Sequence, residues 1–260
     1  MIEGLREPDG GNIVIDGQAV WPKPEATKRL IGVQLQSTAL FDYLTVREMI
    51  ILFGTFYGLR LSNSDADQLL DTVGLTEKHK AKVNELSGGQ QQRLSIALSL
   101  VNDPMIIFLD EPTTGLDPQA RRRMWDVIRD ISSQGKTVVL TTHYMEEAEV
   151  LCGRVAVMDK GKIISLDTPL NLVKSLGAKA KITFNCEPKL DIDTLKGLPG
   201  TTDVSEIEQS YIVYSKDVQN SVLGILGEAK ENNSLVENLS VSGANLEDVF
   251  LHLTGRGLRD

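Results

Sequence analysis

The chain has 260 residues, of which 41% are hydrophobic, and it carries a formal net charge of −9 at pH 7. This length accommodates one large domain and a small one, while the acidic charge without basic clusters argues against a nucleic-acid-binding protein. The two cysteines, Cys152 and Cys186, are too few for a metal or disulfide framework, which is typical of a reducing compartment.

A β-hairpin and a further short strand are predicted in the first part of the chain. Asp16-Gly17 is a typical turn between two short strands. The mostly apolar stretch Ile31–Leu35 predicts another strand, which ends at Gln36. Gln34 is the alternative amide in this region, but the strand register favours Gln36 as the residue at the strand end.

The next segment predicts helices and an anion site. Residues 45–82 read as helical, with Thr45 as the N-cap. Ser87 is a good N-cap for the apolar-periodic helix Gln90–Val101, and Gly88-Gly89 place no side chains over its first turn. Free backbone N–H groups and the positive end of the helix dipole then favour an anion. An ordinary capped helix after a loop is the alternative interpretation.

Two adjacent carboxylates follow a predicted buried strand. The run Met105–Leu109 is continuous and apolar, which is typical of a parallel strand buried on both faces. Asp110 and Glu111 follow at its carboxyl end, where open α/β sheets bind their ligands. Because adjacent carboxylates repel unless a cation or a reacting group lies between them, the pair predicts a ligand site. An acidic surface strand end is the alternative.

Helices and strands continue to alternate after this pair. Arg121–Gln134 predicts an amphipathic helix, and Thr137–Thr141 predicts a β-branched strand with His143 just beyond its end. If this strand neighbours the one before Asp110, the side chain of His143 reaches the same crevice. Thr168-Pro169 then begins a short helix by the cap-then-proline rule.

The C-terminal part of the chain changes character. It predicts the element order β-α-β-β-α-β of a ferredoxin-like split βαβ unit, with strands at Ala180–Cys186, Asp203–Glu208, Tyr211–Ser215 and Leu235–Val241. Asn245–Leu253 predicts a final helix. We therefore expect a large domain over residues 1–167, a linker helix over 168–179 and a small α+β accessory domain over 180–260.

The motifs and their order resemble those of the ATP-binding-cassette (ABC) ATPases. Leu86-Ser87-Gly88-Gly89-Gln90 resembles the signature motif that opens a helix, and Asp110-Glu111 resembles the end of the Walker B strand. Pro112–Asp117 resembles the D-loop that follows it. Gln36 resembles the Q-loop glutamine, and His143 resembles the switch histidine.

The resemblance covers about residues 1–167 and implies an α/β fold, namely an ABC-type P-loop NTPase core, truncated at its N-terminus, with a helical subdomain. The catalytic residues would be Glu111, which polarises the attacking water, His143, which contacts the γ-phosphate, and Gln36. Asp110 would hold Mg²⁺ together with Gln36. ATP would lie between two chains, and the residues that bind it would be Asp110, Ser87, Gly88, Gly89, Gln90 and Asp117, of which the signature residues serve the partner's nucleotide.

A narrower resemblance concerns export. Ser37–Tyr57, Thr141–Glu147 and Asp248–Arg256 resemble the corresponding stretches of ABC-2-type drug and antibiotic exporters. This implies a cytoplasmic ATPase subunit, peripheral at the inner face of the cell membrane, that works as a homodimer or heterodimer with separate transmembrane permease subunits and without nucleic acid. The most apolar long stretch, Met49–Leu59, is far shorter than the roughly 20 residues that span a bilayer, so a membrane role requires such partners.

Two alternative functions stay open. One is a soluble ABC-type ATPase of translation or chromosome maintenance, although this chain has one signature and no sustained heptads. The other is a non-catalytic binding module, because the 260 residues contain no G-x-x-x-x-G-K-[ST] phosphate-binding loop (P-loop). Residues 1–11 resemble the stretch that directly follows the P-loop helix in this family, so we expect the sequence to be a fragment.

We predict that these 260 residues by themselves bind ATP weakly and show no steady-state turnover. The physical reason is that the P-loop supplies most contacts to the β- and γ-phosphates of the nucleotide. Calorimetric titration with Mg-ATP measures this affinity, and micromolar binding by a pure sample would contradict the prediction.

Overall fold

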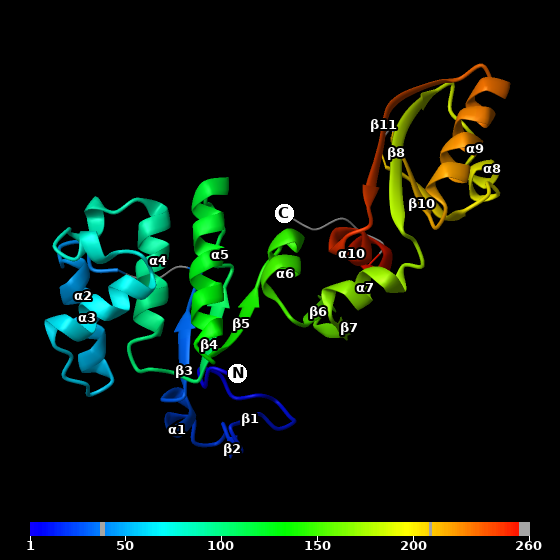
Figure 1. Cartoon of the computed structure of the whole chain (residues 1–260). Coiled ribbons are helices and arrows are strands. Elements are labelled where there is room, and N and C mark those ends of the chain that lie inside the picture. The colour runs from blue at the N-terminus through cyan, green and yellow to red at the C-terminus, as the bar shows by residue number, and fades with distance from the viewer. Residues whose placement is uncertain (37–39, 208–209, 255–260) are drawn as a thin grey trace. The chain divides into compact units, whose positions relative to one another are not determined.

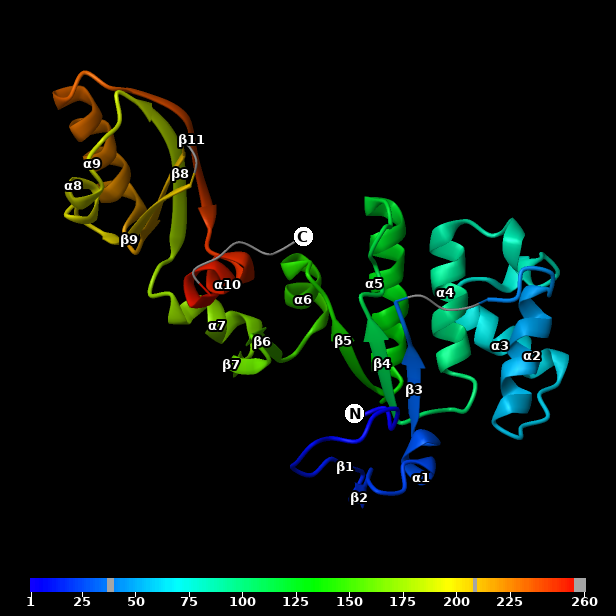
Figure 2. The ribbon, with the colours of Figure 1, turned by 180° about the vertical axis from the view of Figure 1, so that it is seen from behind.

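The computed structural model describes residues 1–36, 40–207 and 210–254, and the chain divides into two compact units, Met1–His143 and Tyr144–Asp260. Each unit has its own sheets and its own buried core (Figures 1 and 2). Among the helices in the described ranges, none is both long and apolar enough to cross a membrane.

The first unit is built on a parallel sheet of three strands. Their order is β3 (Ile31–Gln34), β4 (Ile106–Asp110) and β5 (Thr137–Thr141). The register places Asp110 opposite Thr141, so the carboxyl ends of β4 and β5 lie side by side. The prediction that the strand before His143 neighbours the strand that carries Asp110 is therefore confirmed.

A hairpin and a single helical turn precede this sheet. The strands β1 (Val14–Ile15) and β2 (Gln18–Ala19) pair antiparallel, and α1 (Glu25–Lys28) follows them, although the sequence pattern did not indicate this helix. Asp16 and Gly17 have φ angles of 47° and 73°. Positive φ at both central residues is the conformation that an Asp-Gly turn favours, which confirms the predicted hairpin.

The two faces of the parallel sheet are covered to different degrees. Ile107 and Leu109 of β4 are fully buried on one face. On the opposite face, Ile106 and Phe108 pack against the cluster formed with the hairpin but remain partly exposed, and Val139 of β5 is 43% exposed. The expectation that β4 is buried on both faces is therefore wrong for the second face, because the short hairpin covers only part of it.

The segment predicted as helical forms two α-helices and two 3₁₀ turns: α2 (Val46–Phe56), α3 (Asn63–Thr72), η1 (Thr76–Lys78) and η2 (Val83–Glu85). A capping box begins α2, because Thr45 accepts from the Glu48 N–H and the Glu48 carboxylate accepts from the Thr45 N–H. This backbone hydrogen bond lowers the pKa of Glu48. Arg47 and Asp67 join α2 to α3 through two hydrogen bonds of 2.9 and 2.8 Å.

The helix α4 (Gly88–Ser99) connects this helical layer to the sheet. Its second half, Leu94–Ser99, is buried, in agreement with the predicted apolar period. Arg93 Nη1 donates to the carbonyl oxygens of Val73 and Gly74, both at 2.9 Å, just after α3 ends. The position of α4 is therefore coupled to the end of α3.

The helix α5 (Pro118–Ser133) runs along one face of the sheet in both views (Figures 1 and 2). It begins earlier than the predicted start at Arg121. The reason is its cap: Asp117 Oδ1 accepts from the N–H groups of Gln119 and Ala120 at 2.9 Å each, and proline occupies the first turn, where no N–H is required.

The second unit begins with a layer of three helices and a hairpin. Its elements are α6 (Met145–Leu151), β6 (Val155–Asp159), β7 (Lys162–Asp167), α7 (Pro169–Ser175) and α10 (Leu246–Thr254). They share one apolar cluster, which consists of Ala148, Val157, Leu172, Leu246 and Val249. The last described helix thus packs on segments that lie far earlier in the sequence.

The rest of the second unit is ferredoxin-like, as predicted. Its elements are β8 (Ala180–Glu187), α8 (Ile192–Lys196), β9 (Thr201–Ile207), β10 (Ser210–Ser215), α9 (Val218–Glu231) and β11 (Leu235–Gly243). The sheet order β11-β8-β10-β9 is antiparallel throughout, and α8 and α9 lie on one face of it (Figures 1 and 2). Phe184 and Tyr211 stack in its core at 5.1 Å. Glu208, the predicted end of the second strand, lies outside the described residues.

A buried polar network joins α10 to this sheet. The fully buried Asp248 accepts hydrogen bonds from Lys181 Nζ at 2.8 Å, from the Tyr214 hydroxyl at 3.0 Å and from the Asn245 N–H at 2.9 Å. Burial, and then the Asp248 charge, raises the pKa of Tyr214 well above its ordinary value. Each partner of the carboxylate therefore acts as a donor, as a buried charge requires.

The compact units divide the chain at a different place from the predicted domain limits. Residues 144–167 lie in the second unit, because α10 returns to pack on the helices that flank them. The predicted limits of 1–167, 168–179 and 180–260 remain predictions about domains.

We predict that Gly32→Ala destabilises the first unit by about 1–3 kcal/mol or more, because overpacking a filled core has this cost. A Cβ at Gly32 would lie 1.9 Å from the carbonyl oxygen of Ser99 and 3.0 Å from the Pro104 ring. Urea denaturation measures the change. Gly10→Ala is the control, since its Cβ would meet nothing within 4 Å. Equal midpoints for the two variants would contradict the prediction.

Candidate active site

The backbone at the end of β4 is held by β5. Glu111 has φ 47°, which is the left-handed region and costs a residue with a side chain about 1–3 kcal/mol. Its N–H donates to both the carbonyl oxygen and the hydroxyl oxygen of Thr141, at 3.1 Å each. The neighbouring strand therefore stabilises the strained residue and sets the direction in which the Glu111 side chain leaves the sheet.

Three side chains from different segments converge on the Glu111 carboxylate. Gln36 Nε2 donates to Oε2 at 3.2 Å, and the Thr114 hydroxyl donates to the same oxygen at 3.0 Å. His143 Nδ1 lies 3.3 Å from Oε1, which makes an ion pair when the imidazole is protonated. The side chains of Glu111 and His143 are 29% and 41% exposed, so the group is open to a ligand. The structure thus unites the three predicted catalytic residues.

Gln34 and Gln36 differ in burial and in hydrogen-bond partners. Gln34 is 1% exposed and donates through Nε2 to the carbonyl oxygen of Leu35 at 2.8 Å, so it belongs to the core. Gln36 is exposed and reaches Glu111. The strand register therefore orients the two amides as the sequence suggested.

Asp110 has one carboxylate oxygen engaged by the neighbouring strand. Its Oδ1 accepts from the Thr141 hydroxyl at 2.5 Å, which leaves Oδ2 as the oxygen to face a cation. Within the residues that the structure describes, no group of three or more His, Cys, Asp or Glu could enclose a metal. Mg²⁺, however, is usually held by one or two carboxylates together with phosphate and water, and Asp110 fits a site of that kind.

The N-terminal end of α4, residues 87–90 (the α4 entrance), is capped as predicted, and its role as an anion site stays a prediction. Ser87 and Gln90 form a capping box, with Gln90 N–H donating to Ser87 Oγ at 3.4 Å and Ser87 N–H donating to Gln90 Oε1 at 2.9 Å. Gly88 faces open space, whereas a Cβ at Gly89 would lie 3.4 Å from the Ala120 Cβ. At Gly88, therefore, neither a side chain nor a neighbouring residue covers the start of this twelve-residue helix.

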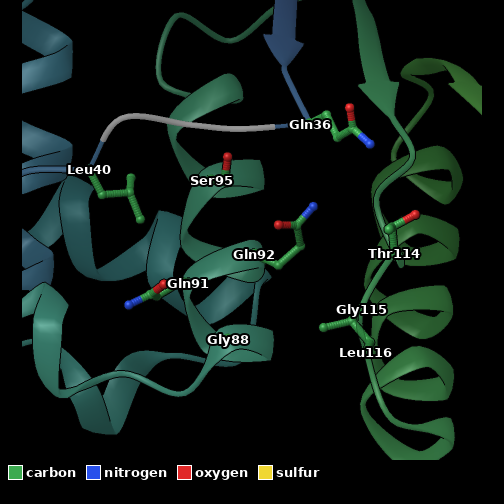
Figure 3. Close-up of a pocket in the computed structure, with 9 residues that line it drawn as sticks. All are labelled: Gln36, Leu40, Gly88, Gln91, Gln92, Ser95, Thr114, Gly115 and Leu116. Carbon is green, nitrogen blue, oxygen red and sulfur yellow. The ribbon is translucent and has the colours of Figure 1, made fainter.

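A cavity of about 310 Å³ lies between α4 on one side and Gln36 and the loop of residues 114–116 on the other. Figure 3 shows Gln36 at the end of β3 and Thr114 in the loop after β4 on one side, and Gln92 of α4 on the other. The complete lining is Gln36, Leu40, Gly88, Gln91, Gln92, Ser95, Thr114, Gly115 and Leu116. Of the predicted site residues, Gln36 and Gly88 line this cavity, while Asp117 caps α5.

Known proteins resemble this chain over its whole length. A family model described as ABC transporter matches residues 1–114. The linearmycin resistance ATP-binding protein LnrL of Bacillus subtilis (strain 168) is 34% identical over 266 residues, which cover 100% of this chain and 86% of that protein. The Nod factor export ATP-binding protein I of Burkholderia lata is 38% identical over 264 residues, which cover 100% of this chain and 84% of that protein.

The chain belongs to the ABC transporter ATPase family. Solved structures agree with this assignment. A dimeric ATP-binding cassette in a post-hydrolysis state, bound to ADP and Pi, has a TM-score of 0.57 and 30% identity, over 64% of this chain and 76% of that one. An ATP-binding subunit of an ABC transporter has a TM-score of 0.57 and 26% identity, over 68% and 74%. The predicted family and ABC-type fold are confirmed, and members of this family are ATPases that bind ATP.

Two hydroxyl groups of this ABC ATPase contact the carboxylate pair although the sequence analysis assigned them no role. Thr114 donates to Glu111, and Thr141 contacts both Asp110 and the Glu111 backbone. A signal for Thr141 exists in the sequence, since the last residue of a strand beside β4 lies opposite Asp110. A threonine is, however, also an ordinary strand residue, so composition alone did not identify it.

Proposed function

We propose that this ABC ATPase is the nucleotide-binding subunit of an exporter, which couples ATP hydrolysis at a dimer interface to export through separate membrane subunits. The convergence of Gln36 and His143 on Glu111 is the observation that carries the hydrolytic part. The export part is supported by the relatives, because one is named for Nod factor export and another for linearmycin resistance.

The residues around the Glu111 carboxylate have different roles in hydrolysis. Glu111 polarises the attacking water, because a carboxylate oxygen accepts a hydrogen bond from it and takes up a proton as the bond to phosphorus forms. Gln36 and His143 orient the Glu111 carboxylate from the ends of β3 and β5. By the family resemblance, His143 would also contact the γ-phosphate. Asp110 and Gln36 would hold Mg²⁺, which would supply positive charge near the phosphate oxygens of ATP.

The α4 entrance serves the nucleotide of a second chain. Its residues are Ser87, Gly88, Gly89 and Gln90. The N–H groups of Ser87 and Gln90 hold the capping box together, and the two glycines place no side chain over the helix start, whose positive dipole end stabilises negative charge on a transferring phosphoryl group. Asp117 lies at the interface between the two chains. The similarity to a dimeric cassette bound to ADP and Pi supports this arrangement. The second chain is another copy or a related ATPase subunit.

The membrane part of the function belongs to partner subunits. Transmembrane permease subunits bind this chain at the inner face of the cell membrane, where it lies as a cytoplasmic, peripheral subunit that takes no part in nucleic-acid binding. The 260 residues contain no G-x-x-x-x-G-K-[ST] segment. Turnover is therefore tested in a form of the chain that carries such a P-loop segment ahead of Met1, called the P-loop form below.

We predict that Glu111→Gln in the P-loop form keeps ATP binding but lowers kcat by about 100-fold or more, which is the usual contribution of general base catalysis. The amide preserves the shape of the side chain and loses the basic oxygen. A steady-state phosphate-release assay measures the rate, and size-exclusion chromatography with ATP should show an accumulated dimer.

The matched control for this variant is Glu77→Gln, an exposed glutamate of η1 that makes the same chemical change away from the site. It should hydrolyse ATP at the parental rate. If Glu111→Gln also turned over at the parental rate, Glu111 would not be the residue that polarises water.

We predict that Gly88→Asp in the P-loop form abolishes dimerisation and turnover while the chain stays folded. An acid in the first turn of α4 stabilises the helix by about 0.3–1 kcal/mol, because it interacts with the positive end of the helix dipole. The same charge repels the partner's γ-phosphate. Thermal unfolding should therefore occur at the parental temperature or above, although phosphate release is lost.

A mixed dimer tests whether this residue serves the partner chain. One chain carries Gly88→Asp and an intact P-loop, and the other carries an inactivated P-loop and an intact α4 entrance. One complete composite site remains, so trapped ATP should be found on the first chain. Gly88→Ala adds no charge and should retain turnover. Nucleotide occupancy that followed each chain's own α4 entrance would contradict the two-chain site.

A further inference from the structure

The hydroxyl group of Thr141 lies between the two carboxylate residues at the end of β4. Its oxygen is 2.5 Å from Asp110 Oδ1 and 3.1 Å from the Glu111 nitrogen. This position follows from the parallel pairing of β4 and β5, which places Thr141 directly opposite Asp110. One hydroxyl group therefore contacts the side chain of one acid and the backbone of the next.

The chemistry of the partners sets the direction of both hydrogen bonds. The Glu111 N–H only donates, so the Thr141 hydroxyl oxygen accepts from it. The single hydroxyl proton is then available for Asp110 Oδ1, which accepts it as a charge-assisted bond. Because the two roles are fixed in this way, the hydroxyl cannot turn without losing one of them.

We propose that Thr141 is a positioning residue for ATP hydrolysis, whose hydroxyl sets the direction of the Asp110 carboxylate and holds the Glu111 backbone in its left-handed conformation. The proposal rests on the proposed hydrolytic role of Glu111. With Oδ1 bound to Thr141, Oδ2 of Asp110 would be the oxygen left for a cation, and Glu111 leaves the strand at the angle that brings it to Gln36 and His143.

The strained backbone makes this role specific to the hydroxyl. At φ 47°, Glu111 needs a compensating contact, and the Thr141 carbonyl oxygen provides one while the hydroxyl oxygen provides the second. A misplacement of about 1 Å in a catalytic group reduces the rate by about 100-fold. Loss of the second contact should therefore change catalysis more than it changes folding.

The substitution Thr141→Val separates the hydroxyl from the rest of the side chain. Valine keeps the β-branched shape that suits a strand, and Thr141 is exposed, so the fold should be unaffected. Thr141→Ser keeps the hydroxyl and removes the methyl group instead. Thr137→Val makes the same chemical change at the other, exposed end of β5 and is the matched control.

The first measurement is hydrogen exchange of the Glu111 amide by NMR in the 260-residue chain, which requires no nucleotide. Thr141→Val should speed this exchange by roughly two- to tenfold, the range expected for one hydrogen bond, while the Leu109 amide in the same strand keeps its parental rate. Thr141→Ser and Thr137→Val should leave Glu111 exchange at the parental value. Unchanged exchange in Thr141→Val would overturn the proposal.

The second measurement is ATP turnover in the P-loop form. Thr141→Val should lower kcat by about ten- to a hundredfold with little change in the KM for ATP, because the hydroxyl positions reacting groups and does not bind the nucleotide. Thr141→Ser should restore most of the rate. A parental kcat in Thr141→Val, or a serine variant as slow as the valine variant, would overturn the proposal.

The two measurements distinguish this proposal from the proposed function. If the proposed function failed, the parental P-loop form would not hydrolyse ATP, while the exchange of the Glu111 amide would still report the hydrogen bond. If only the positioning role failed, the parent would hydrolyse ATP and Thr141→Val would do so equally well.

Discussion

The parallel pairing of β4 with β5 is the constraint on which the candidate site depends. It brings the end of β5 against Asp110 and lets Thr141 hold Glu111 at a positive φ, a conformation that a glutamate rarely adopts alone. The turn that results aims the Glu111 carboxylate at Gln36 and His143, which leave their own strands at the same edge. The chemistry of the site is thus a consequence of strand order, since each group lies at the carboxyl end of one of three adjacent strands.

The position of α4, whose residues line one side of the cavity, depends on a different contact. The α4 entrance is oriented by the helix behind it, and Arg93 of that helix donates to the last carbonyl groups near the end of α3. Burial, and then the charge of Arg123, lowers the pKa of Arg93. A change in the helical layer would therefore move the signature residues relative to the carboxylates.

Local patterns predicted most elements, because each depends on residues close in sequence. The strand Thr137–Thr141 has the bounds that its β-branched pattern indicates. The contacts of Thr141 and Thr114 with the carboxylates were not predicted. The Thr141 contact depends on strand pairing between distant segments, and the Thr114 contact depends on the turn after β4. The degree of burial on each face of β4 could not be predicted either, since it depends on which segments pack against the sheet.

The second unit contains long-range contacts that the local character of the sequence does not indicate. A domain boundary after residue 167 follows from the change in local character along the chain, but α10 crosses that boundary in space. The N–H of Leu246 donates to Glu149 of α6 at 2.6 Å, and Asp248, two residues later, is bound by Lys181 and Tyr214 of the sheet. One short helix therefore makes hydrogen bonds on both sides of the predicted limit. Because an unpaired buried charge is costly, we expect α10 to fold together with the sheet that supplies Lys181 and Tyr214 to Asp248.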